Sequence, residues 1–161
     1  MKSVNRIIII CCFVLIAGFS NAQTLSPKIV FKDHPLTHNM HVTSDGQYLY
    51  TCNGGKSDLG QISKFTFDGT KTGSYKIELD MRSIMYNPAD KKLYVSTYSQ
   101  KLFKINDLAQ GMYSEVFDFS ERSEQSAPAI SPDGKLIYFM EYGEVYVYNL
   151  KNKKLKTTLS G

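Results

Sequence analysis

Short runs of apolar residues, separated by clusters of Gly, Asp, Asn and Pro, follow one another along most of the chain. In "GEVYVYN", residues 143–149, apolar and polar positions alternate with a period of two, which is typical of a half-buried β-strand. No segment shows a strong 3.6-residue pattern, and the 11 Tyr and 9 Phe without any Trp are a mixture that favours sheets. The pattern predicts an all-β protein.

The strand pattern recurs with a period of 44 residues. Three stretches align without gaps: "VTSDGQYLYTCN" from Val42, "YNPADKKLYVST" from Tyr86 and "ISPDGKLIYFME" from Ile130. Each contains the end of a strand A, a polar turn and a strand B. In "SPDGK" the Pro presets the first turn position and Gly134 supplies the positive φ that the turn needs.

Two further strands complete each unit. We expect strands B, C and D at 47–51, 61–67 and 75–79 in the first unit, at 92–97, 100–105 and 114–119 in the second, and at 135–140, 143–149 and 154–159 in the third. A repeat of about 44 residues with four antiparallel strands predicts a β-propeller blade. The three blades would cover about 38–80, 81–124 and 125–161.

Three blades are fewer than the 4–8 of known propellers, so we expect the ring to be incomplete in this chain. A lone predicted strand at 27–31 precedes the first blade, and residues 23–37 form an N-terminal strand and inlet loop. Two explanations stay open: the sequence is part of a longer or truncated propeller, or several copies close a ring together. An open wedge exposes the flat faces of its outer blades, which predicts self-association.

The first 22 residues are predicted to be a signal peptide. Lys2 and Arg6 precede an apolar run at 7–18, and small residues lead to a cleavage point before Gln23. An uncleaved anchor is the alternative. We expect an exported protein, periplasmic or secreted, with no stable membrane span after cleavage. Loss of Lys2 and Arg6 would lower the formal net charge from +4 to +2, which gives no electrostatic case for nucleic acid.

All three histidines lie in "HPLTHNMH": His34, His38 and His41. On an extended strand His38 and His41 would point to opposite faces, so we do not expect a three-histidine metal site. In the repeat register His41 matches apolar or small residues, which predicts a structural side chain packed inside and bonded to neighbouring backbone. His38 matches Arg82 and Ser126, where each strand A begins.

The loops from D to A and from B to C lie on one face of a propeller, around the mouth of its channel. We expect His38, Arg82, Ser126 and His34 at this mouth, and Glu124 of "DFSERSE" beside them. These five residues are the candidate ligand-binding set.

The B–C loop of the first blade, "CNGGKSDLG" at 52–60, is longer than its two counterparts. It makes Asn53, Lys56 and Asp58 candidates for recognition, because extended loops on rigid scaffolds carry function. A solvated insertion without a role is the alternative. Cys52, the one cysteine outside the first 22 residues, is expected to be a buried thiol rather than a nucleophile.

Two stretches, "SPDGKLIYFMEYGEVYVYNLKNKKLKTTL" and "SDGQYLYTCNGG", resemble the exported YVTN-type propeller repeats. That family is related to the TolB-type and lactonase-type seven-bladed propellers, and the resemblance covers Met40 to about Leu159. It implies a propeller fold with ligands at the channel mouth. The Trp-Asp signature of WD repeats is missing, since the chain has no Trp.

Two functions follow from these patterns. One is a non-catalytic binding or scaffold module that presents its loop-rich face to a protein, peptide or glycan. The alternative is a lactonase-like or quinoprotein-like enzyme, in which His38, Arg82 and Glu124 would hold a metal or cofactor. No Ser/His/Asp order or paired-carboxylate spacing stands out, and the sequence identifies no cofactor.

Overall fold

The computed structural model describes residues 30, 32–33, 37–119 and 126–160. The predicted signal peptide, most of the predicted strand at 27–31, and the candidate residues His34 and Glu124 lie outside these residues. Within the part of the chain that the structure describes, no helix is long and apolar enough to cross a membrane.

Within these described ranges, twelve strands form three sheets. The first sheet holds β1 (His38–Ser44), β2 (Leu49–Gly54), β3 (Gln61–Phe65) and β4 (Lys71–Lys76), with the 3-10 helix η1 (Ser57–Leu59) between β2 and β3. The second holds β5 (Met81–Asn87), β6 (Lys92–Thr97), β7 (Lys101–Asp107) and β8 (Met112–Asp118). The third holds β9 (Ala129–Ile130), β10 (Leu136–Glu141), β11 (Glu144–Asn149) and β12 (Leu155–Ser160).

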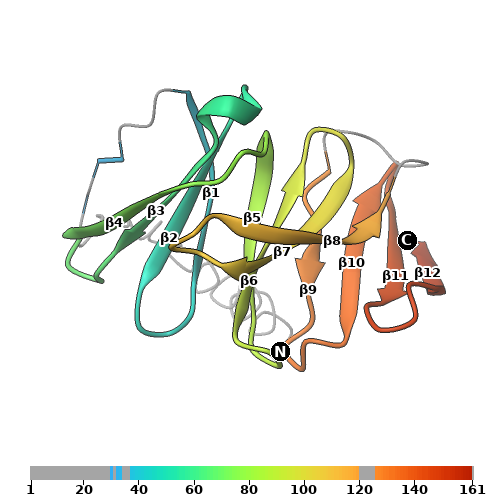
Figure 1. The fold of residues 1–161 in the computed structure, drawn as a ribbon. Coiled ribbons are helices and arrows are strands. Elements are labelled where there is room, and N and C mark those ends of the chain that lie inside the picture. The colour runs from blue at the N-terminus through green and yellow to red at the C-terminus, as the bar shows by residue number, and fades with distance from the viewer. Residues whose placement is uncertain (1–29, 31, 34–36, 120–125, 161) are drawn as a thin grey trace, which may run out of the picture.

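Each sheet is antiparallel, and its strands are neighbours in chain order. The three sheets stand side by side as propeller-like blades and do not close into a ring (Figure 1). The all-β fold, the four-stranded units and the incomplete ring are confirmed. This topology puts the B–C and D–A connections at one end of every blade and the A–B and C–D turns at the other. We call the first end the loop face.

The blades are held together by two apolar seams. Ten buried residues fill the seam between the first two blades: Tyr50, Cys52, Ile62, Ile77, Leu79, Met81, Ile84, Leu93, Val95 and Ile105. Eight fill the seam between the second and third: Met85, Tyr94, Leu102, Phe117, Phe119, Ile137, Phe139 and Tyr148. Alternate residues of β5 and β6 serve opposite seams, so the second blade is buried on both sides.

The repeat also fixes the A–B turns. Tyr50 donates its hydroxyl to Asp45 Oδ2 at 2.8 Å, and Tyr94 donates to Asp90 Oδ2 at 2.7 Å. Tyr50 and Tyr94 occupy equivalent positions of the repeat, whereas Asp90 lies one residue after the position equivalent to Asp45. In the third blade Gly134, at φ 69°, occupies the turn. The aspartate–tyrosine pair ties a turn to the strand that follows it.

Strand D of the first blade was predicted at 75–79, and this prediction is wrong. The strand is β4, Lys71–Lys76. The turn before it closes early, because the Thr66 amide donates to the Thr70 carbonyl at 2.9 Å and the strand can begin at the next residue. The residues after β4 then become the linker to the second blade, where Ile77 and Leu79 are buried.

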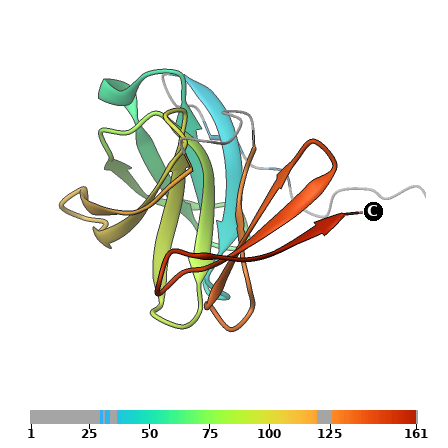
Figure 2. The same cartoon turned by 90° about the vertical axis from the view of Figure 1, so that its right-hand side faces the viewer.

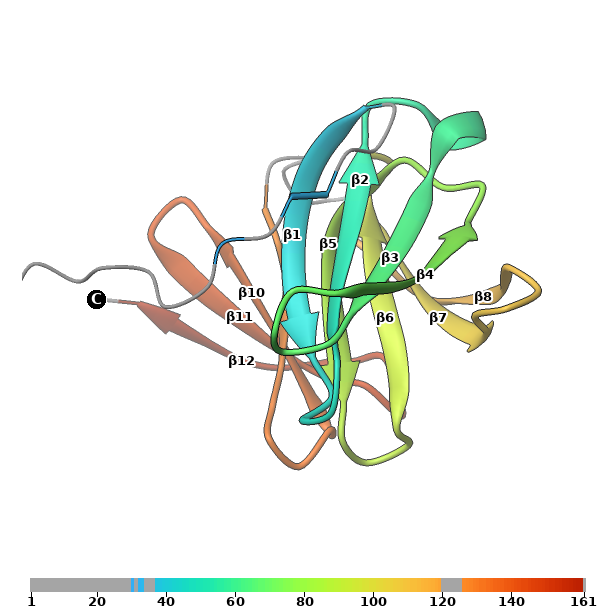
Figure 3. The same ribbon diagram turned by 90° about the vertical axis from the view of Figure 1, so that its left-hand side faces the viewer.

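The first described residues of the chain lie on the outer side of the first blade, turned away from β5. Figures 1 and 3 show these first described residues, in blue, on that side of the sheet. The Asp33 carboxylate accepts hydrogen bonds from Thr51 Oγ1, from Ser63 Oγ at 3.1 Å and from Lys71 Nζ at 3.1 Å. Its side chain is only 6% exposed. We call this side the capped end face.

Candidate binding site on the loop face

The long loop of the first blade is held at its base by Asn53, which is 1% exposed. Its amide nitrogen donates to the Leu59 carbonyl at 2.9 Å and to Thr37 Oγ1 at 2.6 Å, and its amide oxygen accepts from the Gln61 amide. The amide group therefore satisfies backbone groups at the end of the loop. Asn53 therefore stabilises the conformation of the loop.

The same loop packs against the linker between the first two blades, at positions where only glycine fits. A Cβ on Gly54 would lie 2.2 Å from the Met81 carbonyl oxygen, and a Cβ on Gly60 would lie 2.1 Å from that of Ile77. The Ile77 amide donates to the Gly60 carbonyl at 2.9 Å. The glycines of the loop thus allow a close backbone approach that fixes the loop on the scaffold.

Asp80 forms hydrogen bonds with residues of two loops and with Arg82 at the predicted channel mouth. Its Oδ1 accepts from the Gly55 amide at 2.6 Å, and its Oδ2 accepts from Arg82 Nη2 at 3.2 Å. Its own carbonyl accepts from the Tyr98 amide at 3.0 Å. The Arg82 guanidinium lies over the Tyr98 ring, 4.6 Å from the ring centroid. Asp80 therefore joins the long loop of the first blade to the short B–C loop of the second.

His38 belongs to the same group of contacts. It pairs with Gly54 in the β1–β2 register, and its Cδ2 lies 3.1 Å from where a Cβ on Gly55 would be. Its ring therefore lies against the loop that Asp80 holds. His38 and Arg82 lie on either side of the contact between the Gly55 amide and the Asp80 carboxylate. Both belong to the loop face.

The prediction that His38 and His41 point to opposite faces is wrong. A bulge between Asn39 and His41 shifts the pairing, so that His38 opposes Gly54 and His41 opposes Cys52. Residues 54 and 52 point to the same side of β2, and the two histidines therefore share that side. No Gly or Pro stands at the bulge, so the sequence pattern does not predict it.

His41 is exposed, so the expectation of a side chain packed inside is wrong. The expected bond to backbone is present, since Nδ1 lies 2.9 Å from the Ile84 carbonyl oxygen of the second blade. Cys52 beside it is buried and free, as predicted. Burial raises the pKa of the Cys52 thiol to about 12, against a weaker lowering from the His41 backbone. This thiol is protonated at neutral pH and is a poor nucleophile.

The remaining candidates are spread over the loop face. Ser126 donates to the Met140 carbonyl at 2.6 Å and so lies against the end of β10 in the third blade. Lys56 and Asp58 are exposed on the long loop. A groove of about 300 Å³ lies beside Asp58, and its walls are Asp58, Leu59, Gly60, Gln61, Ser74 and Lys76. The groove has one carboxylate, one ammonium and two neutral polar side chains.

Among the described residues, no group of three or more His, Cys, Asp or Glu side chains is placed to hold a metal ion. The loop face instead offers hydrogen-bond donors and acceptors, one guanidinium and one imidazole. Such groups can orient a polar ligand.

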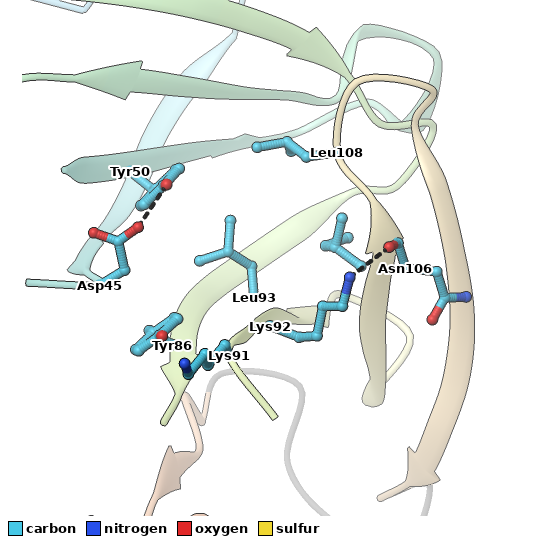
Figure 4. A pocket seen from close by; sticks show the side chains of 9 residues that line it. Asp45, Tyr50, Tyr86, Lys91, Lys92, Leu93, Asn106 and Leu108 are labelled. Atoms are coloured by element: carbon cyan, nitrogen blue, oxygen red, sulfur yellow. Dashed lines mark hydrogen bonds between the residues drawn. The ribbon is translucent and has the colours of Figure 1, made fainter. Parts of the chain in front are cut away.

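Two pockets at the opposite end of the blades were not predicted. One, of about 180 Å³, lies in the first seam between the Asp45–Tyr50 pair and Lys91, Lys92 and Leu93 (Figure 4). The other, of about 380 Å³, lies in the second seam between the Asp90–Tyr94 pair and the Gly134 turn. They occupy equivalent places in consecutive repeats. The pairing of an aspartate in the A–B turn with a tyrosine in strand B recurs in the first two repeats, and this pattern could have predicted the pockets.

Asp80 and Tyr98 are the other residues that the sequence reasoning missed. Asp80 stands two places before Arg82, and that spacing gave no reason to pair them before the linker was known. A comparison with protein-family models gives no match, and a comparison with curated proteins gives none either. The fold alone defines the class of the protein: an all-β chain with three propeller-like blades.

Proposed function

We propose that the protein is an exported binding module of the YVTN propeller type and that its loop face receives a protein, peptide or glycan ligand. The observation that supports this most strongly is the contrast within the long loop of the first blade. Asn53, Gly54 and Gly60 are buried and fix its two ends, while Lys56 and Asp58 are exposed. A loop with fixed ends loses little conformational entropy when a ligand binds its exposed part.

The groove beside this loop gives the ligand its chemistry. Asp58 and Lys76 stand on its walls with Gln61 and Ser74. A ligand that fills it must be polar and must supply donors as well as acceptors, as a peptide backbone or a glycan hydroxyl does. Arg82, which bonds Asp80, and His38, whose ring lies against Gly55, add further polar groups to the loop face.

The test is a binding screen of the purified protein against peptide and glycan arrays, followed by titration of each positive with variants. The double variant Lys56→Ala with Asp58→Ala should weaken binding about tenfold or more, as expected for loss of two polar contacts. Lys154→Ala, at the opposite end of the third blade, is the control and should leave binding unchanged. Equal binding by the double variant and the wild type would reject the loop face as the site.

A further inference from the structure

The two seam pockets, at the end of the blades opposite the loop face, are built from equivalent parts of consecutive repeats but differ in size. Lys91 lines the first pocket and Lys135 the second, and these lysines are one repeat apart. In the first pocket Lys92 Nζ donates to the Asn106 carbonyl at 2.9 Å, along one wall (Figure 4). The residue equivalent to Lys92 in the next repeat is Leu136, which has no ammonium to form such a bond. The first pocket has about 180 Å³ and the second about 380 Å³, so the second reaches the size that is usual for small-molecule sites.

The inner wall of the larger pocket, which we call the second seam pocket, is a tight contact between the second and third blades. A Cβ on Gly134 would lie 2.0 Å from Asn87 Oδ1 and 2.5 Å from the Ala89 Cβ. Asn87 is 2% exposed, Tyr94 beside it is 4% exposed, and Asn87 Oδ1 accepts from the Ala89 amide at 2.9 Å. These contacts fix the A–B turns of both blades against each other, so this wall is formed before any ligand binds.

The wall on the third blade is also fixed by hydrogen bonds. The Leu150 amide donates to the Lys135 carbonyl at 2.9 Å, which joins the C–D turn to the A–B turn. Asn149 Oδ1 accepts from the amides of Lys151 at 3.0 Å and Asn152 at 3.1 Å, which holds the C–D turn in its conformation. The second seam pocket therefore has preformed walls on both blades.

The lining combines apolar surface with ammonium groups. Ala89, Leu150 and the ring of Tyr94 supply the apolar surface, and Lys135 and Lys151 supply positive charge from the third blade. Lys135 Nζ lies 3.4 Å from Asp133 Oδ2, in an exposed pair that water screens. Lys151 forms no ion pair with any residue that the structure describes.

Asp90 also lines the pocket, but its charge is already compensated within the second blade. Its Oδ2 accepts from the Tyr94 hydroxyl at 2.7 Å and lies 3.9 Å from Lys104 Nζ. Its Oδ1 accepts from the Lys92 amide at 3.2 Å. The charge left to interact with a ligand is therefore positive, and it favours an anion.

We propose that the second seam pocket binds a small organic carboxylate. The apolar body of this ligand would lie against Ala89, Tyr94 and Leu150, and its carboxylate would lie at the ammonium groups of Lys151 and Lys135. The site is independent of the one proposed on the loop face, because it lies at the opposite end of the blades and uses none of the same residues.

The test is a titration of the isotope-labelled protein with phenylacetate, followed by the amide chemical shifts in nuclear magnetic resonance spectra. A probe of about ten non-hydrogen atoms is expected to bind with a dissociation constant of about 1 mM. The amides of Gly134, Leu150 and Lys151 should shift most. Phenylacetamide, which lacks the charge, and phenethylamine, which carries the opposite charge, should each bind about tenfold more weakly or not at all.

Variants at exposed positions test the role of the two ammonium groups. Lys151→Gln should raise the dissociation constant about threefold, and Lys151→Gln with Lys135→Gln about tenfold, with the other amide shifts unchanged. Lys156→Gln is the matched control, because it removes the same charge from an exposed position of β12 that does not line the pocket. It should bind phenylacetate like the wild type.

Three results would overturn the inference. The first is an absence of shifts at about 20 mM phenylacetate. The second is equal binding of phenylacetate by the double variant and the wild type, or equal binding of the amide or the amine by the wild type, since either shows that the ammonium groups do not select the ligand. The third is a set of shifts confined to the first seam pocket or to the loop face, which would place the site elsewhere.

Discussion

We expect Asp33 to attach the N-terminal segment to the first blade. The loss in the free energy of unfolding caused by Asp33→Ala should measure the strength of this attachment. The substitution leaves the hydroxyls of Thr51 and Ser63 without their acceptor. Hydrogen bonds to a charged group contribute about 1.5–3 kcal/mol each, offset in part by desolvation of the carboxylate. Lys71 is 38% exposed, so its ion pair adds less than about 1 kcal/mol. We expect a net loss of about 2–3 kcal/mol in the free energy of unfolding.

The assay is urea denaturation followed by far-UV circular dichroism. With a slope of about 2 kcal/mol per molar urea, the midpoint should fall by about 1–1.5 M. Lys32→Ala, at an exposed neighbouring position, is the control and should change the midpoint little. A midpoint for Asp33→Ala within about 0.2 M of the wild type would show that the segment does not stabilise the blade through this carboxylate.

The same pair of proteins should differ with pH in a defined direction. Burial alone would raise the pKa of Asp33, but hydrogen bonds from Thr51, Lys71 and Ser63 and the charge of Lys71 lower it below its usual value of 3.8. A carboxyl with a lowered pKa in the folded state contributes stability that is complete above the unfolded pKa and is lost as pH falls toward the folded pKa. The wild type's advantage over Asp33→Ala should therefore be constant above about pH 5 and shrink below about pH 4.

Three further predictions test the loop, the turn pair and the buried thiol. Gly60→Ala should lower the free energy of unfolding by about 2 kcal/mol or more, because its Cβ would lie 2.1 Å from the Ile77 carbonyl oxygen, and an unchanged thermal midpoint would contradict the close approach. Tyr94→Phe should lower the free energy of unfolding by about 1 kcal/mol through loss of the 2.7 Å hydrogen bond to Asp90. In the wild type, burial raises the pKa of the Tyr94 phenol, so spectrophotometric titration should show it ionising above its usual range, and an ordinary midpoint would contradict the buried pair. In a chain that starts at residue 23 and keeps Cys52 as its single cysteine, a thiol reagent at neutral pH should react only at the rate of unfolding, and a rapid stoichiometric reaction would place the thiol at the surface.

The repeat made most of the fold predictable. Strand β6 runs over Lys92–Thr97, the range expected from alternation and the preceding turn, and the other strands except β4 lie within a few residues of their predicted ranges. The β4 error arose from taking the turn as too long: Asp68-Gly69, with Gly69 at φ 88°, already forms the turn, and a backbone bond closes it at Thr70. Alternation within strands is a local property and can be read locally, whereas turn closure depends on which carbonyl an amide reaches.

The site was less predictable because its key contacts join residues from different blades. The repeat register gave no sign of Asp80, a linker residue whose carboxylate accepts a hydrogen bond from the Gly55 amide in the long loop of the first blade. The bulge near His41 likewise changes which side a histidine faces without any glycine or proline to mark it. Such long-range contacts depend on the path of the linker in the folded protein, and the periodicity of the sequence does not predict that path.

The central claim is that three blades stand in a row, with the second buried on both sides and the third exposed on one. Methionine oxidation, followed by peptide mass spectrometry at low protein concentration, tests this directly. Met81 and Met85 lie on β5 and are 0% and 7% exposed, while Met112 and Met140 are 54% and 66% exposed. We expect Met112 and Met140 to oxidise rapidly and the two methionines of β5 to be protected until the protein unfolds. Oxidation of Met81 and Met85 at the rate of Met112, or protection of Met140 in the monomer, would contradict the arrangement.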